Sequence, residues 1–218
     1  MRWRYVIRPR RFRQELEYNR MRGHSMIMQD PFFFGYGSLV NRRTHSFQNA
    51  QPARVSGWRR AWRRSPFRDV CYLTAVPDRE DYIEGLIASV PGANWAVLDE
   101  RERAYARVPL GSEVQHSAGA VEVAIYAIER GHHHTPTDDN PVLLSYIDVV
   151  VQGYLSEFGM AGVTHFFETT EGWHAPILND RLAPIYPRAQ TLTEEERALV
   201  DEGLSRLSAK VKQGYPLG

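Results

Sequence analysis

Residues 31–39 have the sequence PFFFGYGSL, in which an apolar run meets two closely spaced glycines. The three phenylalanines, Phe32–Phe34, predict a short buried strand. Gly35 and Gly37 predict that this strand ends in a turn, because glycine adopts backbone angles that other residues rarely adopt. The rest of a sheet is therefore expected around this strand.

Further segments rich in β-branched and aromatic residues predict more strands before residue 130. They are Ala53–Trp62, Val70–Val76, Tyr82–Val90 and Val121–Ile128, separated by turn residues at Pro66, Pro77-Asp78 and Pro91-Gly92. Helices are expected over about Trp95–Tyr105, from Asn140-Pro141 to Gly159, and from the capping box Thr193-Glu194-Glu195-Glu196 to about Lys210. Strands first and helices later indicate an α+β fold, a mainly antiparallel sheet or small barrel with flanking helices.

Composition limits the classes of protein that the chain can belong to. With 218 residues, 43% of them apolar, we expect one packed domain over residues 31–218. Residues 1–30 are arginine-rich and are expected to be an unstructured leader or the product of a start assigned too early. A net charge of +1 argues against a nucleic-acid partner, and no apolar run is long enough to cross a membrane. The single cysteine, Cys71, and the lack of a secretion signal predict a cytoplasmic protein, whose oligomeric state the sequence leaves open.

One carboxylate falls on the apolar face of the first predicted helix. Trp95, Leu98, Glu102 and Tyr105 are spaced by three, four and three residues, so they share that face. Asp99, Glu100, Arg101 and Arg103 fall on other faces, with Asp99 and Arg103 spaced as an ion pair. Burial raises the pKa of a carboxyl group, which favours Glu102 as a general base. The alternative is a structural ion pair with Arg107 or another arginine.

The glycine turn is a second candidate for chemistry. Successive backbone N–H groups of residues 36–39 can hold a carboxylate or an oxyanion, although two glycines alone favour a plain tight turn. The third glycine of a dinucleotide-binding loop and the elbow of a serine hydrolase are both missing.

Together, the two features resemble the γ-glutamylcyclotransferase superfamily. Phe34–Leu39 resembles its N-terminal loop, most strongly that of the ChaC-like, glutathione-degrading branch, and Leu98–Glu102 resembles the segment with the catalytic glutamate. Leu39 separates the chain from the branch that has Gly-Ser-Asn in this loop. The resemblance covers about residues 31–128 and implies a small mixed β-barrel with flanking helices.

The resemblance also implies a cofactor-independent enzyme for a small γ-glutamyl substrate. The α-amine of the γ-glutamyl group attacks its own γ-carbonyl, and 5-oxoproline and an amine are released. Glu102 is the implied acid/base, Tyr36, Gly37, Ser38 and Leu39 hold the substrate, and Tyr105 orients the substrate or the base. Glutathione is the favoured substrate, with γ-glutamyl amino acids, dipeptides and amines open. The rival hypothesis is a non-catalytic binding module on the same fold.

Three other patterns have ordinary explanations. His132-His133-His134 is expected to be a solvated loop rather than a metal site, because adjacent histidines do not converge easily on one ion. The segment Trp58–Arg64 alternates aromatic residues with arginines, and we expect its tryptophans to cover the core and its arginines to reach water. Single-stranded nucleic acid is the alternative ligand for that segment. Tyr186-Pro187-Arg188 is expected in a surface loop, or as a cap on a pocket.

Overall fold

The computed structural model describes residues 29–66, 69–137 and 139–213. Apart from Gln29 and Asp30, the leader predicted for residues 1–30 lies outside the described residues. No helix within the described ranges is both long enough and apolar enough to cross a membrane.

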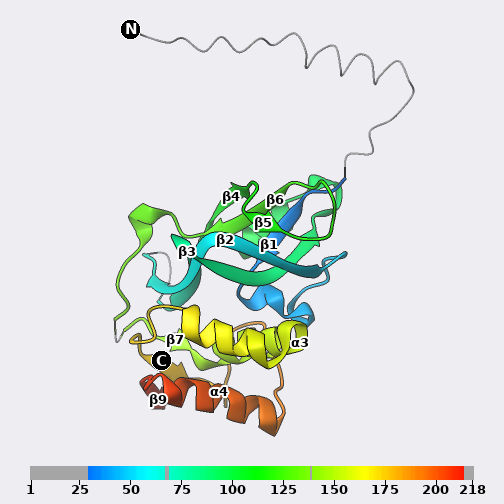
Figure 1. Cartoon of the computed structure of the whole chain (residues 1–218). Helices are drawn as coiled ribbons and strands as arrows, with labels where there is room; N and C mark the ends of the chain where they lie inside the picture. Colours follow the sequence, from blue (N-terminus) through cyan, green and yellow to red (C-terminus); the bar gives the residue numbers. More distant parts are fainter. Residues whose placement is uncertain (1–28, 67–68, 138, 214–218) are drawn as a thin grey trace, which may run out of the picture.

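The main sheet has six strands in the order β4-β6-β1-β3-β2-β5. The strands are β1 (Phe32–Gly35), β2 (Gln51–Arg64), β3 (Cys71–Ser89), β4 (Ala106–Leu110), β5 (Val114–Gln115) and β6 (Val123–Ala127). The phenylalanine run forms the buried strand β1, which pairs antiparallel with β3 and parallel with β6. The other pairs in this sheet are antiparallel, so the prediction of a mainly antiparallel sheet is confirmed, and the sheet is curled (Figure 1).

The turn predicted at Pro77-Asp78 is wrong, because β3 runs through it as one 19-residue strand. The pairing of β2 with β3 is interrupted there by a bulge, between Ser56–Tyr82 and Trp58–Pro77. Gly57, at φ +80°, is the single β2 residue opposite residues 78–81. Glycine tolerates this backbone angle, so the long hairpin bends without breaking.

The helix predicted over Trp95–Tyr105 is shorter than expected. It spans Ala96–Arg101 as α2. The backbone of Glu102, with φ −101° and ψ 24°, is no longer helical. Tyr105 instead immediately precedes β4, a strand that the sequence analysis missed together with β5. Glu102 and Tyr105 therefore lie between α2 and β4, where helical spacing does not determine their directions.

The C-terminal part contains two helices and a second, three-stranded sheet. Strands β7 (Val142–Leu143), β8 (Ile177–Asn179) and β9 (Val211–Gln213) are parallel neighbours. Helix α3 (Leu144–Thr169) begins after β7, not at Asn140-Pro141, and is kinked at Gly159, whose φ of +63° interrupts it where an end was predicted. Helix α4 (Glu194–Arg206) has the predicted capping box between Thr193 and Glu196 but ends before Lys210.

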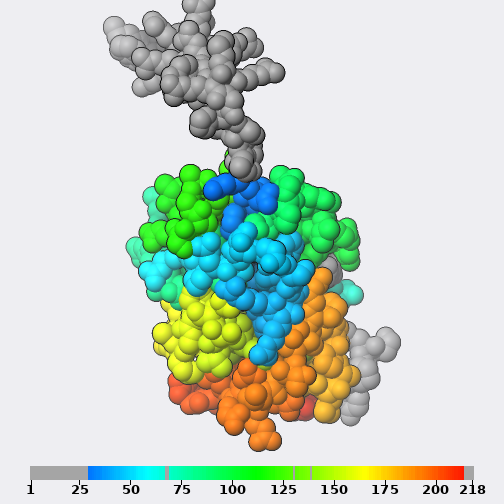
Figure 2. Space-filling model, turned by 90° about the vertical axis from the view of Figure 1, so that its right-hand side faces the viewer, coloured from blue at the N-terminus to red at the C-terminus, as the bar shows by residue number. Residues whose placement is uncertain are grey.

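The two parts share one core. Helix α3 packs beneath the main sheet and α4 packs against α3, as Figure 1 shows. In the space-filling view the yellow-to-red C-terminal part lies directly under the blue-to-green sheet (Figure 2). Buried residues of both parts, including Phe34, Leu86, Val150 and Phe166, belong to one apolar cluster. The α+β fold class is therefore confirmed.

Candidate active site

The glycine loop lies between β1 and a short 3-10 turn, η1 (Ser38–Val40). The first backbone hydrogen bond of this turn runs from the Val40 N–H to the carbonyl oxygen of Gly37, at 3.0 Å. A Cβ atom on Gly37 would lie 2.4 Å from the hydroxyl oxygen of Tyr146, so this position needs glycine for close approach. The loop therefore brings backbone N–H groups next to a tyrosine of α3.

Tyr36 and Leu39 turn their side chains into the protein. The Tyr36 hydroxyl donates to the carbonyl oxygen of Tyr126 at 2.6 Å and accepts from Ala75 N–H at 3.0 Å. Burial, above all, raises the pKa of Tyr36 far above its ordinary value of 10.0. The side chain of Leu39 is buried in a small cluster with Phe33 and other apolar residues. Both residues therefore offer a ligand their backbone more than their side chains.

Glu102 faces a cleft from the end of α2, with 16% of its side chain exposed. Arg101 lies beside it, with Nε 3.1 Å from Glu102 Oε1. The same guanidinium donates to Ser38 Oγ at 3.2 Å and to the Thr44 carbonyl oxygen at 3.0 Å. Arg101 therefore fastens the end of α2 to the glycine loop and holds Glu102 near Ser38.

This arrangement corrects the predicted positions of the charges on the helix. Arg101, expected on the wet face, is only 9% exposed and is the arginine paired with Glu102. Arg107 pairs with Asp99 at 3.0 Å, and Arg103 pairs with Glu100 at 3.1 Å, so the predicted pair of Asp99 with Arg103 does not form. Because α2 ends at Arg101, the helical spacing no longer fixes the directions of the following side chains.

Two tyrosines line the cleft near Glu102. The Tyr105 hydroxyl donates to the carbonyl oxygen of Leu73 at 3.1 Å, which fixes its ring on the cleft wall. Tyr146, which the sequence analysis missed, comes from the first turn of α3 and receives a backbone hydrogen bond from Ser38. Burial is the main reason that the pKa of Tyr146 is well above 10.0, and the nearby charge of Glu102 adds to it. No local pattern marks Tyr146, because only the packing of α3 brings it to the loop.

The cleft has a volume of about 780 Å³, and a small inner pocket of about 30 Å³ adjoins it. Ser38, Glu102, Tyr105 and Tyr146 line both spaces, and Gly37 lines the inner pocket. Tyr186, Pro187 and Arg188 line the outer cleft, so of the two alternatives for this segment the structure favours the pocket cap. All the predicted site residues, Tyr36, Gly37, Ser38, Leu39, Glu102 and Tyr105, are thus brought together around one inner pocket.

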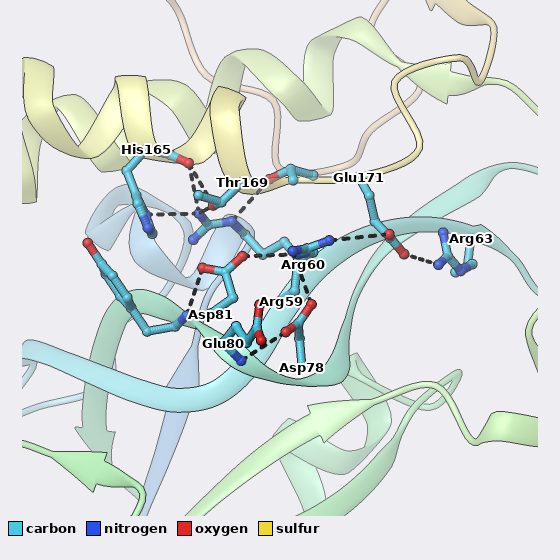
Figure 3. A network of polar contacts seen from close by, with 11 residues as sticks. Arg59, Arg60, Arg63, Asp78, Glu80, Asp81, His165, Thr169 and Glu171 are labelled. Carbon is cyan, nitrogen blue, oxygen red and sulfur yellow. Dashed lines mark hydrogen bonds and ion pairs between the residues drawn. The ribbon is translucent and has the colours of Figure 1, made fainter.

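The arginine-rich segment is a structural network in which one arginine is fully buried. Arg59 and Arg63 pair with Asp78, Asp81 and Glu171, as Figure 3 shows. Arg60, expected to reach water, is 0% exposed and points to α3, where it donates to His165, Thr169, Thr170 and Tyr154. Helix α3 packs against β2 and covers this arginine.

Histidine and cysteine form no metal cluster in the described part of the chain. His133 Nε2 lies 2.7 Å from the Ile128 carbonyl oxygen, and His132 lies near Glu129. Cys71 lines the cleft, and its thiol donates to the Asn140 carbonyl oxygen at 2.9 Å.

Comparison with known proteins assigns the chain to a family. The family model described as Gamma-glutamyl cyclotransferase, AIG2-like matches residues 33–145, more than half of the chain, and the chain belongs to this family. No curated protein sequence is significantly similar to it. The matched residues include the glycine loop and Glu102 and end immediately before Tyr146.

Solved structures share the fold. A structure titled "Gamma-glutamyl cyclotransferase" is 15% identical, with a TM-score of 0.52 over 80% of this chain and 99% of that one. An uncharacterized protein from Homo sapiens is 14% identical, with a TM-score of 0.52 over 79% and 99%. A yeast γ-glutamyl cyclotransferase specific to glutathione is more distant, at 12% identity and a TM-score of 0.40, and carries no argument about substrate.

Proposed function

We propose that this protein releases 5-oxoproline from a γ-glutamyl compound, with Glu102 as the acid/base. The observation that carries the proposal is the position of Glu102 in the cleft, bridged by Arg101 to Ser38 of the glycine loop. Membership of the γ-glutamyl cyclotransferase family supports the reaction class. The resemblance of residues 34–39 to the ChaC-like loop makes glutathione the first substrate to test.

Binding starts the proposed mechanism. The backbone N–H groups of the loop Tyr36–Leu39, other than that of Ser38, which donates to the Tyr146 hydroxyl, hold the glutamyl carboxylate or the γ-carbonyl oxygen in the inner pocket. The Tyr146 hydroxyl, already at the Ser38 N–H, stays protonated at neutral pH because its pKa is raised, so it can donate to the same oxygen. Tyr105 forms part of the wall that keeps the substrate folded, with its amine near its own carbonyl carbon.

Proton transfer through Glu102 completes the reaction. The carboxylate takes a proton from the α-ammonium group, and the free amine attacks the γ-carbonyl carbon, forming a carbon–nitrogen bond and an oxyanion. The oxyanion then collapses and the bond to the leaving nitrogen breaks, while Glu102 returns its proton to that nitrogen. The ring nitrogen gives up its remaining extra proton, so that it becomes the N–H of the lactam and the released amine is an ammonium group. The products are 5-oxoproline and the free amine, without a net change in oxidation state.

The experiment is incubation with glutathione and with a panel of γ-glutamyl amino acids, dipeptides and amines. We expect 5-oxoproline together with the matching amine, which is Cys-Gly for glutathione, and at least an approximately hundredfold lower kcat for Glu102→Gln. Normal turnover by a folded Glu102→Gln protein would refute the role of Glu102. Binding of panel members without release of 5-oxoproline would support the rival, a non-catalytic binding module.

A further inference from the structure

The outer wall of the cleft is built by a loop that lies outside the family segment. We name residues 180–188 the wall loop; they follow β8, and the match to the family ends at residue 145. Ile185, Tyr186, Pro187 and Arg188 of this loop line the cleft whose other wall carries Glu102. One wall of the cleft is therefore built by residues of the C-terminal part, opposite residues of the family segment.

The wall loop is anchored to α3 by two charged residues. Buried Asp180 accepts from Ser145 N–H at 2.8 Å, from Ser145 Oγ at 2.6 Å and from Ile185 N–H at 2.9 Å. Arg181 donates to both carboxylate oxygens of Asp148, at 2.8 and 2.7 Å. These bonds fix both the start of α3, which carries Tyr146, and the loop itself.

An aromatic contact connects the wall loop to the inner pocket. The rings of Tyr146 and Tyr186 are 5.0 Å apart and nearly perpendicular, at 87°. Arg188 follows two residues after Tyr186 and borders the same cleft. A substrate whose glutamyl carboxylate or carbonyl oxygen enters the inner pocket has room for its leaving group in the cleft beside Tyr146, Tyr186 and Arg188.

The charges on the cleft lining single out Arg188. Arg101 is paired with Glu102, and Arg103 with Glu100. Within the ranges that the structure describes, no carboxylate lies in ion-pair contact with Arg188. Exposed Asp69 is the other charged residue of the lining without an ion pair in these ranges. Arg188 is half-buried, so its guanidinium is available to a carboxylate in the cleft.

Two exposed apolar side chains lie on the lining of the cleft. Val97 is 72% and Ile185 41% exposed, and both line it. The volume of about 780 Å³ lies in the range of sites that hold drug-sized molecules, which exceeds the needs of a glutamyl group alone. The remaining space fits a leaving group with an apolar side chain.

We infer that Arg188 recognises a carboxylate on the leaving amine, which makes the preferred substrates γ-glutamyl compounds of amino acids or peptides with an apolar side chain. This inference rests on the proposed function. The inference adds to the proposed function a residue that determines specificity and makes no contact with the reacting atoms.

The test compares γ-glutamyl-leucine with γ-glutamyl-leucinamide, which differ only in the carboxylate. For the wild-type protein we expect a KM for the acid lower by at least about tenfold, since a charge-assisted hydrogen bond is lost in the amide. Arg188→Ala should raise the KM of the acid to that of the amide, with kcat little changed, and Arg188→Lys should fall between. Arg197→Ala, which removes an exposed positive charge from α4, is the matched control and should keep the preference.

An unchanged acid-to-amide ratio in a folded Arg188→Ala protein, or no preference in the wild type, would overturn the inference. If no γ-glutamyl compound yields 5-oxoproline, the proposed function fails, and calorimetric binding of the two dipeptides to wild-type and Arg188→Ala proteins tests Arg188 separately. Tighter binding of the acid that disappears in Arg188→Ala would support it. Equal or absent binding would overturn it.

Discussion

Arg60 donates through Nη1 to the hydroxyl of Tyr154 at 2.8 Å, in a part of the core where Arg60 has no exposed surface. The same hydroxyl lies 2.9 Å from the carbonyl oxygen of Tyr36 and 2.7 Å from that of Glu84. Tyr36 belongs to the glycine loop, so one tyrosine joins the buried arginine of β2 to the backbone of the candidate active site. The ring of Tyr154 also lies 5.2 Å from the Arg60 guanidinium carbon.

Tyr154→Phe should therefore destabilise the protein. The substitution leaves buried donor and acceptor groups without their partner, which costs about 1–3 kcal/mol. Urea unfolding measures the change. Tyr82→Phe is the control, because the Tyr82 hydroxyl has no hydrogen bond within the described residues, and its effect should stay within about 0.5 kcal/mol. Equal stability of the two variants would contradict the importance of this link.

Gly37→Ala should reduce 5-oxoproline release without unfolding the protein. The new Cβ atom would lie 2.4 Å from the Tyr146 hydroxyl oxygen, the end of a side chain that can be displaced. The displaced tyrosine would lose its hydrogen bond from the Ser38 N–H. Because a catalytic site tolerates displacements of only a few tenths of an ångström, we expect kcat/KM to fall by at least about tenfold. Gly131→Ala, where nothing lies within 4 Å of the added atom, should keep full activity.

Protonation of His165 should lower the free energy of unfolding at acidic pH. Arg60 can only donate, so His165 Nδ1, 3.2 Å from Arg60 Nη2, accepts and the ring is neutral. Burial and then the charge of Arg60 lower the pKa of His165 below 6.5. The unfolded chain therefore binds a proton first as the pH falls through about 6.5, and stability that is present above this pH is lost below it.

Urea midpoints at pH 7.5 and pH 5.5 check this prediction. The fall in midpoint should be smaller for His165→Gln than for the wild type, whereas exposed His174→Gln should behave as the wild type does. Part of the fall should persist in His165→Gln, because burial also lowers the pKa of His45. If the urea midpoint of His165→Gln depended on pH as that of the wild type does, His165 would not be a source of the loss of stability in acid.

Cys71 should react slowly with thiol reagents in the folded protein. Burial raises the pKa of the Cys71 thiol to about 12, and the thiolate is the reactive form. Labelling with Ellman's reagent at pH 8 should therefore be slow in buffer and complete in urea. Fast labelling of the native protein would show that the thiol is exposed to the cleft in its reactive form.

Local sequence determined the features that depend on neighbouring residues. The phenylalanine run and its two glycines predicted β1 and its loop, and the Thr193–Glu196 capping box predicted the start of α4, because such elements are fixed by short-range sterics and hydrogen bonds. The glycine loop and Glu102, found by pattern, are close to each other in the structure. The helical spacing failed at the end of α2, because Glu102 and Tyr105 lie after the last residue of the helix and before β4.

Only the tertiary structure decided which distant side chains meet. Arg60 is buried because α3 covers β2, Arg101 faces Glu102 because α2 ends there, and Tyr146 reaches Ser38 because α3 packs under the glycine loop. The wall loop adds Tyr186 and Arg188 from a segment more than 80 residues after Glu102. Such contacts follow from the packing of whole elements in one core, and no short stretch of sequence contains that information.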